Sequence, residues 1–225
     1  DVAPSRGLGD VYKRQVQIGY EGTDSRGKTF RGQIRIQVNQ GSGSRYFQDM
    51  GSYAWAAPYV DLLYEAGVIT GTGGQRYRPA DAVSRGDFML MLYRAFQLTP
   101  ASGAGFPDVP PGSYYAQAIQ AARAAGIASG YPDGGFHPQE PVTRQDAMVL
   151  LERTMQATGW SLGAANTGYL SGFRDGGMVA PYAQEAMSHM IEYGIITGTP
   201  EQKLNPIQSI SRAEMAVMLA RAITF

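Results

Sequence analysis

The stretch FPDVPPGSYYAQAIQAARAAGIASGYPDGGFHPQEPVTRQD, residues 106–146, contains the pattern that decides the fold. It opens with Phe106-Pro107-Asp108, runs through an alanine-rich segment to Gly126, and closes on Thr143-Arg144. Similar openings occur at Phe47-Gln48-Asp49 and Phe173-Arg174-Asp175. In all three copies the glycine precedes the arginine by 18 residues (67 to 85, 126 to 144 and 194 to 212). Such in-register spacing identifies an internal repeat.

Apolar residues in each copy follow the period of an amphipathic helix. In the second segment of each copy they recur at i, i+3, i+4, i+7 and i+8, which is the buried stripe of a helix. These stripes are Phe88, Met91, Leu92, Ala95, Phe96; Ala147, Leu150, Leu151, Thr154, Met155; and Met215, Met218, Leu219, Ala222, Ile223. One helix pair cannot bury its own apolar face, whereas three packed copies can. We therefore predict a mainly α fold with three helix-loop-helix repeats, 47–97, 106–158 and 173–224, in a pseudo-threefold bundle.

The N-terminal part has a different character. Residues 16–38 contain two runs that alternate apolar and polar residues around a turn-rich loop, and this pattern predicts a β-hairpin. We interpret it as a remnant of a truncated upstream β-sandwich, joined by a linker at residues 39–46. Asp10–Gln15 resembles a translated sequencing adapter, so we expect residues 1–15 to be non-native; a genuine hydrophilic segment is the alternative.

Composition excludes several classes of protein. The 225 residues carry a net charge of +0 with a pI of about 6.9, which is not typical of a nucleic-acid binder. The chain has 0 cysteines and lacks an apolar run long enough for a membrane span, and its start shows no signal peptide, so an export signal would lie upstream. His137 and His189 lack the spacing of metal ligands. We therefore expect no catalytic residues, no metal and no cofactor, and predict that the chain is not an enzyme.

The second copy resembles the S-layer homology (SLH) family. It carries Phe106-Pro107-Asp108-Val109, Gly130-Tyr131-Pro132-Asp133-Gly134 and Thr143-Arg144-Gln145-Asp146. The other copies keep Gly67-Val68-Ile69-Thr70-Gly71 with Ser84-Arg85-Gly86-Asp87, and Gly194-Ile195-Ile196-Thr197-Gly198 with Ser211-Arg212-Ala213-Glu214. They depart from the family pattern after Gly71 and Gly198, where Tyr-Pro-Asp-Gly is expected, so the first and third grooves are expected to differ in shape or to bind weakly.

The resemblance implies a secreted bacterial protein, located at the cell wall or S-layer, whose three repeats hold it there. The implied ligand is a secondary cell wall polysaccharide, often with a pyruvylated sugar, bound in inter-repeat grooves. The arginine of the family's Thr-Arg-Ala-Glu motif falls on Arg85, Arg144 and Arg212. Two alternatives are structural self-assembly in an S-layer and a peptidoglycan-binding module attached to an upstream wall enzyme.

The residues around these arginines have a physical logic of their own. Ser84, Thr143 and Ser211 stand at helix N-cap positions, with an acidic residue three places later, so each arginine comes first in its helix. The helix dipole and free backbone N–H groups there favour an anion, and a guanidinium binds a carboxylate with two prongs. The alternative is a purely structural cap, with the arginine paired to a neighbouring repeat.

Other candidate contacts lie nearby. Tyr131 is predicted to stack on a sugar ring, and Trp55 and Tyr115 are expected to pack beneath the groove. Gly71, Gly130 and Gly198 would let a ligand approach the backbone closely, although a helix C-terminal turn explains these glycines equally well.

Overall fold

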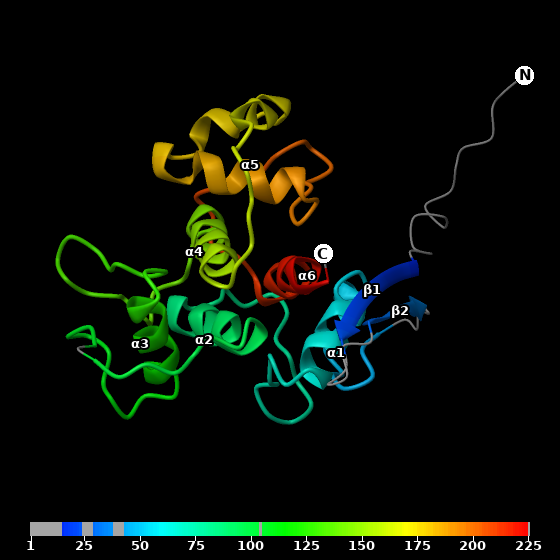
Figure 1. Cartoon of the computed structure of the whole chain (residues 1–225), viewed down its shortest axis with the longest axis horizontal. Coiled ribbons are helices and arrows are strands. Elements are labelled where there is room, and N and C mark those ends of the chain that lie inside the picture. Colours follow the sequence, from blue (N-terminus) through cyan, green and yellow to red (C-terminus); the bar gives the residue numbers. More distant parts are fainter. Residues whose placement is uncertain (1–14, 24–28, 38–42, 104, 225) are drawn as a thin grey trace, which may run out of the picture.

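The computed structural model describes residues 15–23, 29–37, 43–103 and 105–224 (Figure 1). Its α-helices are α1 (Ala57–Glu65), α2 (Arg85–Ala95), α3 (Ala116–Ala124), α4 (Arg144–Ala157), α5 (Gln184–Glu192) and α6 (Arg212–Ile223). Short 3₁₀ helices span Gly51–Tyr53, Thr167–Gly172, Gly176–Met178 and Pro181–Ala183. Two strands, β1 (Gln15–Thr23) and β2 (Thr29–Gln37), precede them. The predicted mainly α fold is confirmed.

The three repeats form a ring in which the second helices lie inside and the first helices outside. Figure 1 shows α2, α4 and α6 around the centre. The outer helices pack on inner helices of the preceding repeat: α3 on α2, α5 on α4, and α1 on α6. Each repeat therefore covers the inner helix of its neighbour with its own outer helix, and this relation, repeated three times, gives the pseudo-threefold arrangement.

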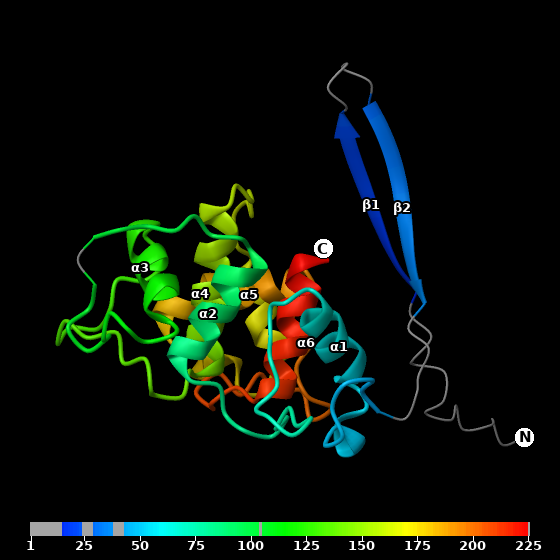
Figure 2. The same cartoon turned by 90° about the horizontal axis from the view of Figure 1, so that it is seen from below.

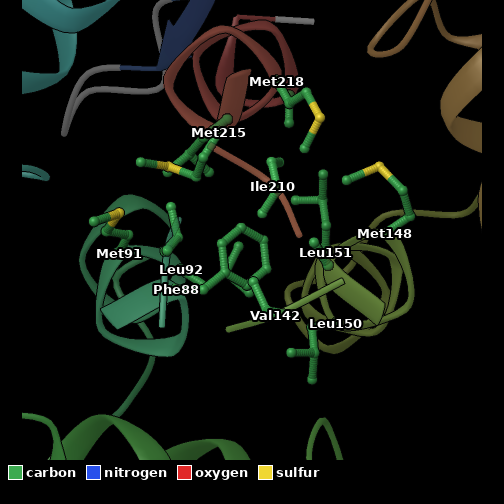
Figure 3. Packing of buried hydrophobic residues seen from close by; sticks show 14 of the residues in the cluster. Phe88, Met91, Leu92, Val142, Met148, Leu150, Leu151, Ile210, Met215 and Met218 are labelled. Atoms are coloured by element: carbon green, nitrogen blue, oxygen red, sulfur yellow. The ribbon is translucent and has the colours of Figure 1, made fainter. Parts of the chain in front are cut away.

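The inner helices bury the apolar stripes that the sequence predicts. Figure 3 shows Phe88 of α2 close to Val142 and Ile210, with Leu151 of α4 and Met215 of α6 around them. All five side chains are at most 2% exposed. Burial of a large apolar side chain contributes about 1.5–3 kcal/mol. This shared core holds the repeats together.

Three short extended segments, one from each repeat, meet at the centre of the ring. The Val83 N–H donates to the Ile210 carbonyl (3.0 Å), the Val142 N–H to the Val83 carbonyl (2.9 Å), and the Ile210 N–H to the Val142 carbonyl (3.1 Å). All three side chains are buried. Each segment thus donates to one neighbour and accepts from the other, so the cycle closes only when three repeats are present.

The aspartate of each opening motif has a structural role. Asp108 accepts hydrogen bonds from the Phe136 N–H (2.9 Å) and the His137 N–H (2.7 Å), and Asp49 and Asp175 bind the matching pairs Tyr77–Arg78 and Leu204–Asn205. Burial acts to raise the pKa of Asp108, but the backbone donors outweigh it and hold this pKa below its usual range. The motif therefore fastens the start of each repeat to the loop before its second helix.

The predicted hairpin is present. β1 and β2 pair antiparallel, from Gln15 opposite Gln37 to Thr23 opposite Thr29, and they stand apart from the helices (Figure 2). Residues 1–14 of the expected non-native segment, residue 38 of the expected hairpin and residues 39–42 of the expected linker lie outside the described residues. The origin of the hairpin in a truncated sandwich stays a prediction. None of the described helices combines the length and hydropathy that crossing a membrane requires.

Candidate functional site

The inner helices begin as predicted. The helices α2, α4 and α6 start at Arg85, Arg144 and Arg212, after the N-cap residues Ser84, Thr143 and Ser211. Each cap oxygen accepts the backbone N–H of the residue three places later, at 3.1, 3.2 and 3.3 Å respectively. Each start lies where two repeats meet. We call these places the first junction (around Arg85), the second junction (around Arg144) and the third junction (around Arg212).

The prediction of free backbone N–H groups at these helix starts is wrong. The Arg85 and Gly86 N–H groups donate to the carbonyls of Glu140 and Pro138, both at 2.8 Å. In the same way, repeat 3 carbonyls cover the start of α4 and repeat 1 carbonyls cover the start of α6. These backbone N–H groups donate to the neighbouring repeat and so help to hold the ring of repeats closed. An anion at a junction must therefore rely on the arginine side chain.

The first junction holds an arginine with aromatic neighbours. The Arg85 guanidinium carbon lies 4.9 Å from the Tyr131 ring centroid and 4.8 Å from that of Phe136, both in repeat 2. Arg85 Nε is buried without a hydrogen-bond partner. Among the described residues, no carboxylate lies within ion-pair distance of this side chain. The charge of Arg85 is stabilised by π faces and remains available to an anion.

A tyrosine hydroxyl satisfies the acidic residue at this junction. Tyr114 of repeat 2 donates its hydroxyl to Asp87 Oδ1 at 2.6 Å. Burial, together with the hydrogen bond to Asp87, raises the pKa of Tyr114 to about 12, so the hydroxyl keeps its proton at neutral pH. Both Asp87 oxygens are thereby engaged, Oδ1 by Tyr114 and Oδ2 by the Ser84 hydroxyl at 2.8 Å.

The third junction resembles the first but holds its arginine more tightly. The Arg212 guanidinium carbon lies 4.5 Å from the Tyr77 ring centroid. Arg212 Nε donates to the Tyr77 carbonyl (2.7 Å) and Nη2 to the Thr70 carbonyl (3.2 Å). Part of its donor capacity is therefore used within the protein. Within the described part of the chain, Arg212 also has no carboxylate at ion-pair distance.

The second junction is different because its arginine has an acidic partner. Arg144 Nη1 lies 3.1 Å from Glu214 Oε1 of repeat 3. The Arg144 side chain is 13% exposed. Burial lowers the pKa of Arg144, and the Glu214 carboxylate opposes that shift. Leu204 stands at the position that Phe136 and Tyr77 hold at the other junctions, so this arginine lacks the equivalent ring.

A charged clamp positions the Tyr131 loop. His137 Nε2 lies 2.7 Å from Asp133 Oδ2, and His137 Nδ1 lies 2.8 Å from Glu140 Oε1. Hydrogen bonds to Glu140 and Asp133 raise the pKa of His137. Its ring also packs edge-on to Tyr131, with centroids 4.8 Å apart. These contacts fix Tyr131 beside Arg85. No described group of histidine, aspartate or glutamate side chains could hold a metal ion.

The three candidate glycines face a phenylalanine of their own repeat. A Cβ atom on Gly71, Gly130 or Gly198 would lie 2.6, 2.6 or 2.5 Å from Cε1 of Phe47, Phe106 or Phe173. Gly130 and Gly198 also have positive φ angles of 77° and 74°. Packing and backbone conformation therefore explain these glycines. Their contact with a ligand stays a prediction.

The aromatic candidates divide between core and surface. Tyr115 is 4% exposed and lies beneath the first junction, where its ring packs against the position of Gly86. The expectation that Trp55 is buried is wrong, because its side chain is 41% exposed. Tyr131 is 38% exposed, as a ligand contact requires.

A second set of arginines also recurs in the repeats. Arg94, Arg153 and Arg221 follow the junction arginines by nine residues and donate to the carbonyls of Val68, Ile127 and Ile195 at 3.4, 3.3 and 3.2 Å. They hold the end of the outer helix to the inner helix of the same repeat. The shared spacing was visible in the sequence, so recurrence alone does not separate a ligand-binding arginine from a structural one.

Comparison with known proteins agrees with this architecture. The S-layer homology domain model matches residues 46–89, 105–148 and 172–216. The chain is 28% identical to an endoglucanase of Bacillus sp. (strain KSM-635), over 77% of this chain and 18% of that protein. It is 29% identical to the surface-layer 125 kDa protein of Lysinibacillus sphaericus, over 79% of this chain and 14% of that protein. It is 24% identical to an S-layer protein of Bacillus thuringiensis subsp. finitimus, over 80% of this chain and 21% of that protein.

The chain therefore spans less than a quarter of the length of these relatives. The three repeats, their helix starts and the family match agree: the chain belongs to the S-layer homology domain family, a family of bacterial cell-surface proteins.

Proposed function

We propose that this chain anchors an exported protein non-covalently to the bacterial cell wall by binding the carboxylate of a pyruvylated sugar in a secondary cell wall polysaccharide. The observation that carries the proposal is the Arg85 guanidinium, which lies between two aromatic rings at a junction of repeats and has no carboxylate partner among the described residues. Family membership supports the coarser part, since SLH domains occur in proteins attached to the wall.

The chemistry of the first junction fits an acidic sugar. A guanidinium offers paired N–H donors that match the geometry of a carboxylate. Tyr131 offers an exposed ring face beside that charge, and sugar C–H groups pack on such faces. One anionic group next to an apolar face is what a pyruvyl ketal on a sugar ring presents. We further propose that the repeats act without catalysis, so an activity of the parent protein would reside in another part of it.

Co-sedimentation with purified wall sacculi tests the proposal. We expect the full chain to pellet with intact sacculi and to stay in solution after chemical removal of the secondary polymer. Binding that survives removal of the polymer would favour peptidoglycan or protein neighbours as the partner. Walls from cells that lack the pyruvyl group separate recognition of the ketal from recognition of the polymer backbone.

A matched pair of variants tests the role of the arginine. Arg85→Ala removes a charge from the first junction, whereas Arg94→Ala removes one from a structural contact with the Val68 carbonyl. We expect Arg85→Ala to weaken wall binding and Arg94→Ala to leave it unchanged, with folding of both checked by circular dichroism. Equal binding by both variants would contradict the role of Arg85.

A further inference from the structure

The three junction arginines occupy the same place in the repeat motif. They differ in the groups that surround their positive charge. We propose that Arg85 and Arg212 each accept a ligand carboxylate, whereas Arg144 does not, because Glu214 of the same chain already occupies it. This inference rests on the proposed function and deepens it. The ring then has two sites that can bind an acidic sugar, at Arg85 and Arg212, and a third arginine, Arg144, whose partner is a glutamate of the same chain.

The Arg144–Glu214 ion pair is the first observation. Its 3.1 Å contact joins an arginine side chain that is 13% exposed to a glutamate that is 38% exposed. A ligand carboxylate would have to displace Glu214 or lie beside it as a like charge. Both routes weaken binding, because charge interactions at a partly buried position are screened less than those in water. The other two arginines contact rings and carbonyl oxygens instead.

The reach of Glu214 is the second observation. In repeats 1 and 2 the corresponding acids are aspartates, and both of their oxygens are engaged: Asp146 binds the Thr143 hydroxyl (2.7 Å) and the Tyr182 hydroxyl (2.7 Å). Glutamate is one methylene longer. One of its oxygens, Oε2, accepts from the Ser211 N–H (2.9 Å) and hydroxyl, and this leaves Oε1 free to contact Arg144.

The third observation concerns the tyrosines that donate hydrogen bonds to the two aspartates. Tyr114 donates to Asp87 and Tyr182 donates to Asp146. The residue at the corresponding place in repeat 1 is Trp55, which has no hydroxyl to offer Glu214. Asp87 and Asp146, which bind these hydroxyls, make no ion pair among the described residues, whereas Glu214, which lacks a tyrosine partner, reaches across to Arg144 of the preceding repeat. Glu214 and Trp55 together therefore determine the specificity of the second junction.

Isothermal titration calorimetry of the full chain tests this inference. The probe is the methyl glycoside of a monosaccharide that carries a pyruvate ketal, chosen as the smallest ligand that has both the sugar ring and the carboxylate. We expect Glu214→Gln to raise the number of sites by one over the wild type, because the amide keeps an oxygen for the Ser211 N–H but carries no charge. The new site should bind about tenfold or more tightly than the second junction of the wild type.

Two further variants keep the test decisive. Asp146→Asn removes a charge from an acid that has a tyrosine partner, and we expect no additional site. Should Glu214→Gln fail to fold, the double variant Trp55→Tyr with Glu214→Asp rebuilds the tyrosine–aspartate contact of the other junctions and should likewise gain one site.

The outcomes separate this inference from the function on which it rests. Binding by the wild type without a gain of a site in either Glu214 variant overturns the inference and leaves the proposed function standing. A folded wild type that does not bind the probe, and does not bind polymer-bearing walls, overturns both.

Discussion

Gly130 precedes the exposed Tyr131. Two physical properties favour a glycine at this position, the backbone conformation and the lack of space for a Cβ atom, and replacement by alanine tests both. Gly130 has a φ of 77°, and a Cβ there would lie 2.6 Å from Phe106 Cε1 and 2.9 Å from the Gly135 carbonyl oxygen. The left-handed conformation costs an L-residue about 1–2 kcal/mol. Overpacking of a buried neighbour costs about 1–3 kcal/mol. We expect Gly130→Ala to lower the free energy of unfolding by about 2–5 kcal/mol.

The chain contains a control for each contribution. Gly126 has a φ of 72° but open space around its Cβ position, so Gly126→Ala measures the backbone cost alone. Gly71 is not in the left-handed region, but its Cβ would lie 2.6 Å from Phe47 Cε1, so Gly71→Ala measures the packing cost alone. We expect about 1–2 and about 1–3 kcal/mol respectively.

Thermal unfolding followed by circular dichroism gives the assay. For a chain of this size, 1 kcal/mol shifts the midpoint by about 2–4 °C, so Gly130→Ala should lower it by about 4–20 °C. Gly130→Ala should also destabilise more than either control. If Gly71→Ala is as stable as the wild type, or Gly130→Ala is no worse than Gly126→Ala, the argument that phenylalanine packing requires the glycine is refuted.

Three further changes to the chain test the cap of α4, the histidine clamp and the closure of the ring. Thr143→Ala removes the cap of α4 and should cost about 1 kcal/mol in urea unfolding, whereas Thr143→Ser should cost less; equal losses would argue against the cap. Because hydrogen bonds to Glu140 and Asp133 raise the folded pKa of His137, its contribution is complete below its ordinary value of about 6.5 and is lost as pH rises through the folded value. The wild type should thus lose more stability than His137→Gln between about pH 6 and 8, and parallel pH profiles would contradict the clamp. A chain that ends at residue 160 loses the carbonyl that accepts the Val83 N–H, and it should unfold without a cooperative transition in a thermal scan; a sharp transition would show that two repeats suffice.

Much of the local structure could be predicted because it depends on residues close together in the chain. The cap at Thr143 and the acid at Asp146 lie within one helical turn, and the structure confirms their hydrogen bond. The stripe of α4 follows from its own period, and Leu150 and Leu151 are buried as expected. Capping and amphipathicity are local properties, so neither requires knowledge of the neighbouring repeats.

The chemistry at the helix starts could not be predicted in this way. The backbone donor of Arg85 is covered by the Glu140 carbonyl, 55 residues further along the chain, which the ring closure brings into contact. Trp55 was expected to pack beneath the groove, but it is 41% exposed. Both outcomes depend on how one repeat packs on the next.

The sequence by itself determined the three repeats, the helices within them, the caps and the arginine at the start of each inner helix, because period and spacing fix these along one segment. Only the tertiary structure decided that each outer helix packs on the preceding repeat, and that Arg85 meets aromatic rings while Arg144 meets Glu214. The physical reason is that partners in a closed ring come from different repeats. Three arginines with the same local motif therefore acquire different electrostatic surroundings.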